Sequence, residues 1–169
     1  MNLWRKFESV VKPWMIVVLF ILVLLFGFYK ESKAESVVSV ELGPTLLSGE
    51  FSEGAALIVN QTWDERWRLG MGYISEQKVT PRREAETSVR ANLFVHGQRI
   101  VSITDRIDLG LGVGYFNAKT RWNGSNFTAS LSIEYSFSDR WGVNFRHWSN
   151  AGSATPNMGQ DVFTAVWRF

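Results

Sequence analysis

The chain has 169 residues, which is enough for one domain. It contains no cysteine, so disulfides and thiolate metal ligands are excluded. Residues 1–34 hold five of the 18 Lys and Arg residues and two of the 16 Asp and Glu residues, which leaves 13 basic and 14 acidic residues in the remainder. The pI near 9.0 therefore reflects the N-terminal segment, and no surface for binding nucleic acid is expected.

Residues 1–34 have the pattern of a secretory signal peptide. A positively charged start precedes an unbroken apolar run from Met15 to Phe28. This run is shorter than the about 20 residues that a transmembrane helix needs. Ser32 and Ala34 then place small residues at the two positions that a signal peptidase reads. We predict cleavage after Ala34, which leaves residues 35–169 as the mature domain; an uncleaved anchor helix is the alternative.

After the leader, the dominant pattern is an alternation of apolar and polar residues. It is clearest in the segments 38–42, 67–73, 89–95, 107–115, 127–137 and 141–145. Such alternation indicates β-strands with one apolar face. One predicted strand, from about residue 85 to residue 103, is less regular, because polar residues at 96–99 interrupt it. We expect a bulge or kink there.

Short and long polar connections follow each other between these strands. The short ones are 64–66, 104–106 and 138–140, and the long ones are 43–52, 76–85, 117–126 and 150–160. Bacterial outer-membrane barrels have short periplasmic turns and longer outer loops. Counting from Ser36, the sequence predicts an all-β fold: an eight-stranded antiparallel transmembrane β-barrel with both ends on the periplasmic side.

Charged residues in the predicted strands indicate which face is inside. They are Glu41, Arg68, Glu86, Arg90, Asp108, Glu134, Arg146 and Arg168. A lipid-facing Arg near the bilayer midplane costs about 2–4 kcal/mol, so we expect these side chains to pair inside a filled barrel without a pore. Aromatic residues make up 14% of the chain, with eight tryptophans, as is ordinary for a membrane barrel. The alternative is a soluble barrel with its apolar face around a ligand cavity.

Three residues near the C-terminus form a candidate catalytic site. His147 and Ser149 share the outward face of the seventh predicted strand, and Asp161 begins the eighth. If Trp141 lies opposite Phe169, Ser149 faces Asp161, and Asp161 lies diagonal to His147 at roughly 7–8 Å between backbones. In such a set the histidine takes the serine proton, and the acid orients the imidazole. Because the site faces lipid, its substrate would be a lipid.

The catalytic interpretation of His147 and Ser149 has an alternative. A His-x-Ser sequence by itself is a weak signal, and an inert histidine at the membrane interface is the alternative. A polar residue in contact with lipid is nevertheless costly unless it has a function. The other histidine, His96, has no comparable neighbours in the sequence and is interpreted as a structural residue of the interior or of the bulge. Because the two histidines lie on different strands and cysteine is absent, no metal or other cofactor is expected.

The C-terminal residues resemble one family. The run HWSNAG at 147–152, the pattern Pro-Asn-x-Gly at 156–159, the acid at 161 and the aromatic C-terminus resemble the outer-membrane lipid A 3-O-deacylases of the PagL type. The specific match covers about the last 23 residues, while the leader and the strand count agree more generally. The resemblance implies an eight-stranded barrel with a lipid-facing Ser-His-acid site at the outer leaflet.

The resemblance also implies roles for individual residues. His147 would be the general base, Ser149 the nucleophile and Asp161 the acid, and Asn150 would help to hold the oxyanion. The acid of the family is usually Glu, so Asp161 is one methylene shorter than expected. Glu134 cannot replace it, because its place in the alternation points inward.

The sequence therefore predicts a serine esterase of the Gram-negative outer membrane. It would hydrolyse the acyl ester at the 3 position of lipid A, with lipid A or lipopolysaccharide as substrate and membrane lipids as surroundings. One alternative is a non-enzymatic structural or surface-interacting barrel with a degenerate site, and another is a phospholipid hydrolase. The sequence leaves a homodimer open, and it does not indicate the preferred acyl chain or the regulation.

Overall fold

The computed structural model describes residues 36–47, 50–63, 65–79, 87–118, 124–153 and 159–169. The strands are β1 (Ser36–Leu47), β2 (Glu50–Trp63), β3 (Trp67–Ile74), β4 (Gln77–Val79), β5 (Thr87–Val89), β6 (Asn92–Thr104), β7 (Ile107–Phe116), β8 (Phe127–Ser136), β9 (Trp141–Ser149) and β10 (Gln160–Arg168). The predicted signal peptide, residues 1–34, lies outside the described residues. In the part of the chain that is described, no helix is long and apolar enough to cross a membrane.

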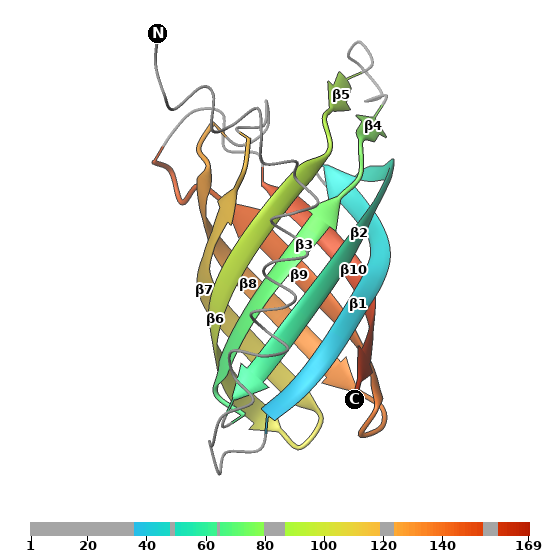
Figure 1. Cartoon of the computed structure of the whole chain (residues 1–169), viewed down its shortest axis with the longest axis vertical. Helices are drawn as coiled ribbons and strands as arrows, with labels where there is room; N and C mark the ends of the chain where they lie inside the picture. The colour runs from blue at the N-terminus through green and yellow to red at the C-terminus, as the bar shows by residue number, and fades with distance from the viewer. Residues whose placement is uncertain (1–35, 48–49, 64, 80–86, 119–123, 154–158) are drawn as a thin grey trace, which may run out of the picture. The chain divides into compact units, whose positions relative to one another are not determined.

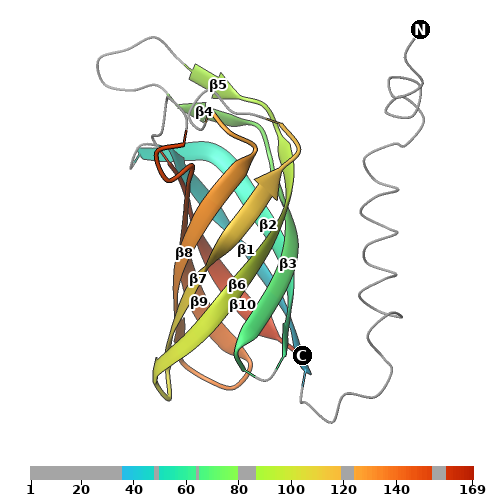
Figure 2. The ribbon, with the colours of Figure 1, turned by 90° about the vertical axis from the view of Figure 1, so that its left-hand side faces the viewer.

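Eight of the strands form a closed antiparallel barrel in the order β1-β10-β9-β8-β7-β6-β3-β2 (Figure 1). The short strands β4 and β5 form a separate two-stranded sheet at one end of this barrel (Figure 2). β10 pairs with β1, with Arg168 opposite Ser39, so the chain enters and leaves the barrel at the same end. The predicted strand number is confirmed, and closure leaves no unpaired edge in the barrel.

The alternation along each strand divides the barrel into an apolar outer face and a polar inner face. In β8 the exposed residues include Phe127, Leu131, Ile133 and Tyr135, and the buried ones are Thr128, Ser130, Ser132 and Glu134. Only a membrane provides an apolar solvent for such an outer face. The alternative of a soluble barrel with its apolar face inward is therefore wrong.

Aromatic side chains gather on the outer face near the end that holds the C-terminus. The rings of Trp141 and Trp167 stack with their centroids 5.7 Å apart, and the ring of Phe169 lies 4.3 Å from that of Trp167. All three side chains are exposed. This is the position of an aromatic girdle, where amphipathic rings lie at the level of the lipid headgroups.

The charged residues inside the barrel pair with each other, as predicted. Arg68 Nη1 lies 2.8 Å from Glu134 Oε2, and Arg146 Nη2 lies 2.8 Å from Glu41 Oε1. Arg168, on the last strand, forms a second ion pair with Glu134. Paired in this way, the charges avoid most of the cost of leaving water.

The other three charged residues that were predicted to face inward are Asp108, Arg90 and Glu86. Asp108 is half-buried and accepts a 2.6 Å hydrogen bond from the hydroxyl of Ser102. Arg90 is exposed, because β6 begins only at Asn92 and Arg90 precedes the barrel wall. Its predicted inward position is therefore wrong. Glu86 lies outside the described residues.

Glu41 connects the first strand of the barrel to the second strand and to the last two strands. Its carboxylate accepts hydrogen bonds from Asn60 Nδ2 at 2.6 Å, Arg146 Nη2 at 2.8 Å, Thr164 Oγ1 at 2.9 Å and Asn144 Nδ2 at 3.1 Å. These donors lie on β2, β9 and β10. A single buried carboxylate therefore joins β1 to β2 and β10, its neighbours in the barrel, and to β9, one strand further on.

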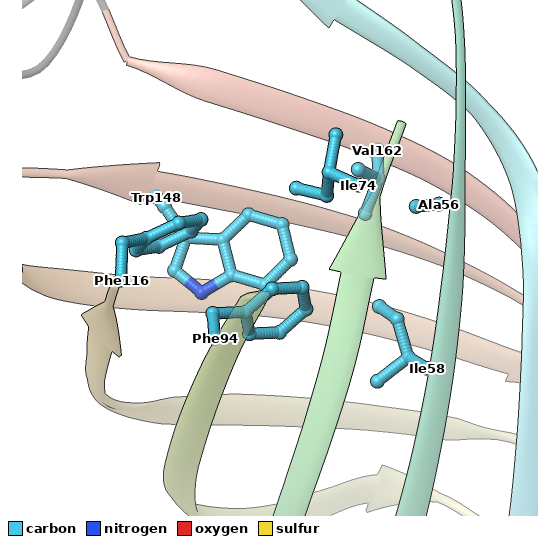
Figure 3. Close-up of a cluster of buried hydrophobic side chains, with 7 residues drawn as sticks. All are labelled: Ala56, Ile58, Ile74, Phe94, Phe116, Trp148 and Val162. Carbon is cyan, nitrogen blue, oxygen red and sulfur yellow. The ribbon is translucent and has the colours of Figure 1, made fainter. Parts of the chain in front are cut away.

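An apolar cluster fills another part of the interior (Figure 3). It consists of Ala56, Ile58, Ile74, Phe94, Phe116, Trp148 and Val162. The indole of Trp148 is fully buried and makes edge contacts with Phe94 and Phe116, at centroid distances of 4.9 and 5.7 Å. Trp148 anchors β9 from the inside, and the alternation then turns the residues before and after it outward.

Two predictions about the strands are wrong. The described part of the polar segment 43–52, which was predicted as an outer loop, belongs to strands, since β1 continues through Gly43 and Pro44 to Leu47 and β2 begins at Glu50. The β1–β2 ladder absorbs Pro44 in a register shift between Pro44 and Leu46. A Cβ on Gly43 would lie 2.0 Å from the carbonyl oxygen of Phe163, so glycine allows β10 to approach closely here.

The expected bulge at residues 96–99 is also absent. β6 pairs with β3 and β7 without interruption through these residues, and its register shift lies further on, between Ser102 and Thr104. His96 and Gln98 are instead buried in the polar interior. The interpretation of His96 as a structural interior residue is confirmed. The predicted short connections between β2 and β3, between β6 and β7 and between β8 and β9 are confirmed by the strand bounds, with residue 64 outside the described residues.

Candidate active site

The candidate site lies on the outer surface of β9 and β10, toward the end of the barrel away from the C-terminus. His147 and Ser149 are half-buried residues on the outward face of β9, and Asp161 has the same orientation on β10. His147 lies directly opposite Asp161, and Trp141 lies opposite Trp167.

The predicted register, with Ser149 opposite Asp161, is therefore wrong by two residues. The chain passes out of the β9–β10 ladder before Phe169, whose N–H donates to the carbonyl of Val38 on β1. A shift of two residues leaves every side chain on its predicted face. It turns the diagonal relationship between His147 and Asp161 into a direct cross-strand pair.

This direct pairing brings the imidazole and the carboxylate into contact. His147 Nδ1 lies 2.5 Å from Asp161 Oδ1, with 40% of the histidine side chain and 18% of the aspartate side chain exposed. Directly opposite residues have Cβ atoms about 4.5–5.5 Å apart, so a short acid reaches its partner. Asp161 therefore reaches His147 although its side chain is one methylene shorter than that of a glutamate. Glu134 is buried inside the barrel and takes no part.

Ser149 lies at the start of a tight turn. The carbonyl of Asn150 accepts a 2.9 Å hydrogen bond from the N–H of Ser153. The two central residues, Ala151 and Gly152, have φ angles of 51° and 79°, as in a type I′ turn. The N–H of Ala151 is thereby directed at Ser149 Oγ, which accepts it at 3.2 Å. Within the described chain, no hydrogen bond joins Ser149 Oγ to the ring of His147.

Asn150 lies beneath this turn. Its side chain is buried, and its Oδ1 accepts a 2.9 Å hydrogen bond from the N–H of Gly152. Asn150 is thus placed next to Ser149, as the sequence indicates, and its carboxamide shapes the turn that follows Ser149.

The N–H of Ala151 is a hydrogen-bond donor beside Ser149 that the sequence does not reveal. A backbone donor is invisible in a residue pattern, and an alanine gives no sign that it adopts a left-handed conformation. Such a conformation costs a non-glycine residue of order 1–3 kcal/mol, and residues of this kind concentrate at functional sites.

The surroundings of the site are apolar and open to lipid. β8 is the other neighbour of β9, and it places Leu131 opposite His147 and Ala129 opposite Ser149. The next outward pair of β9 and β10 consists of Phe145 and Phe163, both exposed. Polar residues within such a surface are costly unless they are used. The small side chain of Ala129 leaves space beside Ser149, while the larger apolar residues line the surface toward the aromatic girdle.

The fold and the site together define a class of protein: an integral membrane β-barrel with a serine, a histidine and an aspartate on its lipid-facing surface. Among the described residues, no group of three or more His, Asp or Glu could hold a metal ion.

Comparison with known proteins identifies the family. The model of the lipid A 3-O-deacylase (PagL) family matches residues 53–169, well over half of the sequence. The chain belongs to this family of lipid A deacylases, which are hydrolases, and it is an integral β-barrel of the outer membrane. No curated protein matches the sequence.

Solved structures of similar shape are outer-membrane barrels. The Yersinia pestis outer membrane protein Ail, in a phospholipid bilayer nanodisc, has a TM-score of 0.50 at 12% identity, covering 80% of this chain and 100% of that chain. The outer membrane enzyme PagL has a TM-score of 0.43 at 20% identity, covering 79% and 98%. Neisserial surface protein A has a TM-score of 0.43 at 12% identity, covering 81% and 98%. At these identities the match with Ail supports the fold alone.

Proposed function

We propose that this protein is a serine esterase that removes the acyl chain at the 3 position of lipid A in the outer leaflet of the outer membrane. The single observation that carries the proposal is the contact of 2.5 Å between His147 Nδ1 and Asp161 Oδ1 on the lipid-facing surface. Polar residues in contact with lipid are costly unless they are used, and a carboxylate that engages the imidazole is the orienting contact of a Ser-His-acid site. Family membership supplies the substrate class.

In the proposed reaction, Ser149 Oγ attacks the ester carbonyl and its proton passes to His147 Nε2. This nitrogen is available because Asp161 engages Nδ1 and thereby selects the tautomer. The negative charge that develops on the former carbonyl oxygen is stabilised by hydrogen-bond donors beside Ser149. We assign this role to Asn150, as the family resemblance implies, together with the N–H of Ala151, which lies 3.2 Å from Ser149 Oγ.

The tetrahedral intermediate then collapses, and the sugar hydroxyl leaves with the proton held by His147. Ser149 retains the acyl group as an ester. A water molecule, deprotonated by His147, attacks this acyl-enzyme and releases the fatty acid with regeneration of the serine. The site needs Ser149 and His147 to approach each other, and catalytic hydrogen bonds of this kind are often long before substrate binds.

The surroundings of the site fit an acyl chain that stays in the bilayer. Leu131, Phe145 and Phe163 form the exposed apolar surface next to His147 and Asp161. A substrate chain can lie along this surface while its ester bond reaches Ser149. Outer-membrane barrels have their longer connections on the outside. In the proposed orientation the start of β1 and the end of β10 lie on the periplasmic side, and the site, toward the other end of the barrel, lies at the outer leaflet, where lipid A is found.

Mass spectrometry of lipid A tests the proposal. The full-length protein is expressed in a Gram-negative host, beside a Ser149→Ala variant and a matched Ser153→Ala control, in which an exposed serine of the same turn is removed. The parent and the control should remove one 3-linked hydroxy-acyl chain, and Ser149→Ala should leave lipid A intact. Intact lipid A with folded parent protein in the outer membrane would mean a non-enzymatic barrel. Release of fatty acid from phospholipid alone would mean a phospholipid hydrolase.

A further inference from the structure

Gly159 lies against the imidazole of His147. The ladder between β9 and β10 ends with Gln160 opposite Trp148. Continuing this register by one residue places Gly159 across from Ser149, on the outward face that carries Asp161. Gly159 is buried although it precedes the strand, and the residue that covers it is His147.

The ring of His147 occupies the place where a side chain at position 159 would begin. A Cβ on Gly159 would lie 2.4 Å from Cε1 of His147, 3.2 Å from Nε2 and 3.3 Å from Nδ1. Real Cβ atoms do not approach a ring atom to 2.4 Å. Because the ring already holds Asp161 at 2.5 Å through Nδ1, it cannot move away from position 159 without changing that contact.

We propose that Gly159 is a positioning residue for the reaction: its missing side chain lets the Cε1 edge of the imidazole lie against the backbone, so that the ring keeps the position in which Nδ1 meets Asp161. The ring is then held at two neighbouring edge atoms, by the hydrogen bond at Nδ1 and by the backbone of Gly159 next to Cε1. This inference rests on the proposed function for its effect on catalysis, but the contact itself does not depend on it.

A glycine at this position could have a simpler explanation, because its φ angle of 73° is left-handed. Gly152 separates the two explanations. Its φ angle is 79°, yet a Cβ there would meet nothing within 4 Å. Both glycines relieve the same backbone strain, and Gly159 alone also makes room for the histidine.

The test uses the full-length protein in detergent with Gly159→Ala, Gly159→Asn and the control Gly152→Ala. Asparagine tolerates the left-handed conformation, so Gly159→Asn folds even where the alanine variant is too strained, and it still carries the Cβ that collides with the ring. We expect both Gly159 variants to lower kcat about 100-fold, the effect of displacing a catalytic group by about 1 Å, with little change in KM.

The second readout is the NMR signal of the imidazoles in protein labelled at histidine. The chain has two histidines, and His96, buried inside the barrel, serves as an internal reference. The His147 ring signals should shift in both Gly159 variants, and the His96 signals should stay in place. In Gly152→Ala the ring signals of both histidines should remain as in the parent, and at most the unfolding temperature of the protein should be lower.

Parental kcat in Gly159→Asn, or unchanged His147 signals in both Gly159 variants, would overturn the inference and leave Gly159 as a turn residue. Equal shifts of the His147 signals in Gly152→Ala would overturn it as well, since strain alone would then explain the effect. If the parent lacks esterase activity, the proposed function fails, and the NMR comparison still decides whether Gly159 positions the ring.

Discussion

His147 and Asp161 face each other across the β9–β10 ladder, with 2.5 Å between Nδ1 of the imidazole and Oδ1 of the carboxylate. A direct cross-strand pair is the shortest connection that two strands offer. In the proposed site, this direct pairing lets the shorter aspartate reach the imidazole where the family resemblance implies a glutamate.

The first prediction concerns the length and the charge of this acid. Asp161→Asn should lower kcat by on the order of 10³–10⁴-fold, because the imidazole loses its orienting anion while the shape is kept. Asp161→Glu should also lower it, because a longer side chain overshoots a partner that is already in contact. Turnover of lipid A in detergent measures both. Parental activity in Asp161→Glu would show that the carboxylate moves freely, and parental activity in Asp161→Asn would remove Asp161 from the site.

The second prediction is that Ser149 and His147 act as one unit. Ser149→Ala and His147→Ala should each abolish most of the activity, and the double variant should be hardly worse than either single variant. Strictly multiplicative losses would contradict a shared step. Heat-modifiable mobility on gels should match the parent in all three variants, since both side chains lie outside the packed interior.

The third prediction concerns the ion pair between Glu41 and Arg146 inside the barrel. Arg146→Ala leaves the buried carboxylate of Glu41 without its cation, and breaking such a pair typically costs about 3–5 kcal/mol. The urea midpoint of unfolding in detergent should fall accordingly, and activity per folded molecule should stay close to that of the parent. Arg140→Ala, at an exposed turn residue, is the control and should leave the midpoint unchanged. A folded Arg146→Ala protein that loses only activity would show that this pair also supports the chemistry on β9.

The fourth prediction concerns the leader. The mature protein in the outer-membrane fraction should begin at Glu35, because Ser32 and Ala34 fit a signal peptidase site. N-terminal sequencing of protein extracted from that fraction gives the answer. An intact Met1 would mean that the apolar segment remains as an anchor. If the parent protein is cleaved after Ala34, the variant Ala34→Leu should block this cleavage.

The sequence by itself determined which residues face lipid and which face the interior. Side chains alternate with a period of two residues in any strand, so apolar and polar positions reveal the face without knowledge of the neighbouring strand. For this reason Glu134, Arg146 and Arg168 were correctly placed inside, and His147, Ser149 and Asp161 were correctly placed together outside. The number of strands followed from the same alternation and from the turns between strands.

Only the tertiary structure decided how the strands align with one another. The alternation is unchanged by a shift of two residues, so it could not distinguish a diagonal contact of His147 and Asp161 from the direct pair that exists. The same holds for Gly43 and Pro44, which read as a loop but lie within β1, because close approach of β10 and a register shift accommodate them.

The finest details of the site depend on backbone conformation, which the residue pattern does not encode. The N–H of Ala151, a residue with a left-handed φ, is directed at Ser149, and the backbone of Gly159, which also has a left-handed φ, lies beside the Cε1 edge of the His147 ring. A side chain has a type that can be read from the sequence, whereas a backbone donor or an empty space exists only when the turns around it are folded. The residue types of the candidate site could therefore be predicted from the sequence, whereas their geometry arises from the closed barrel that holds them.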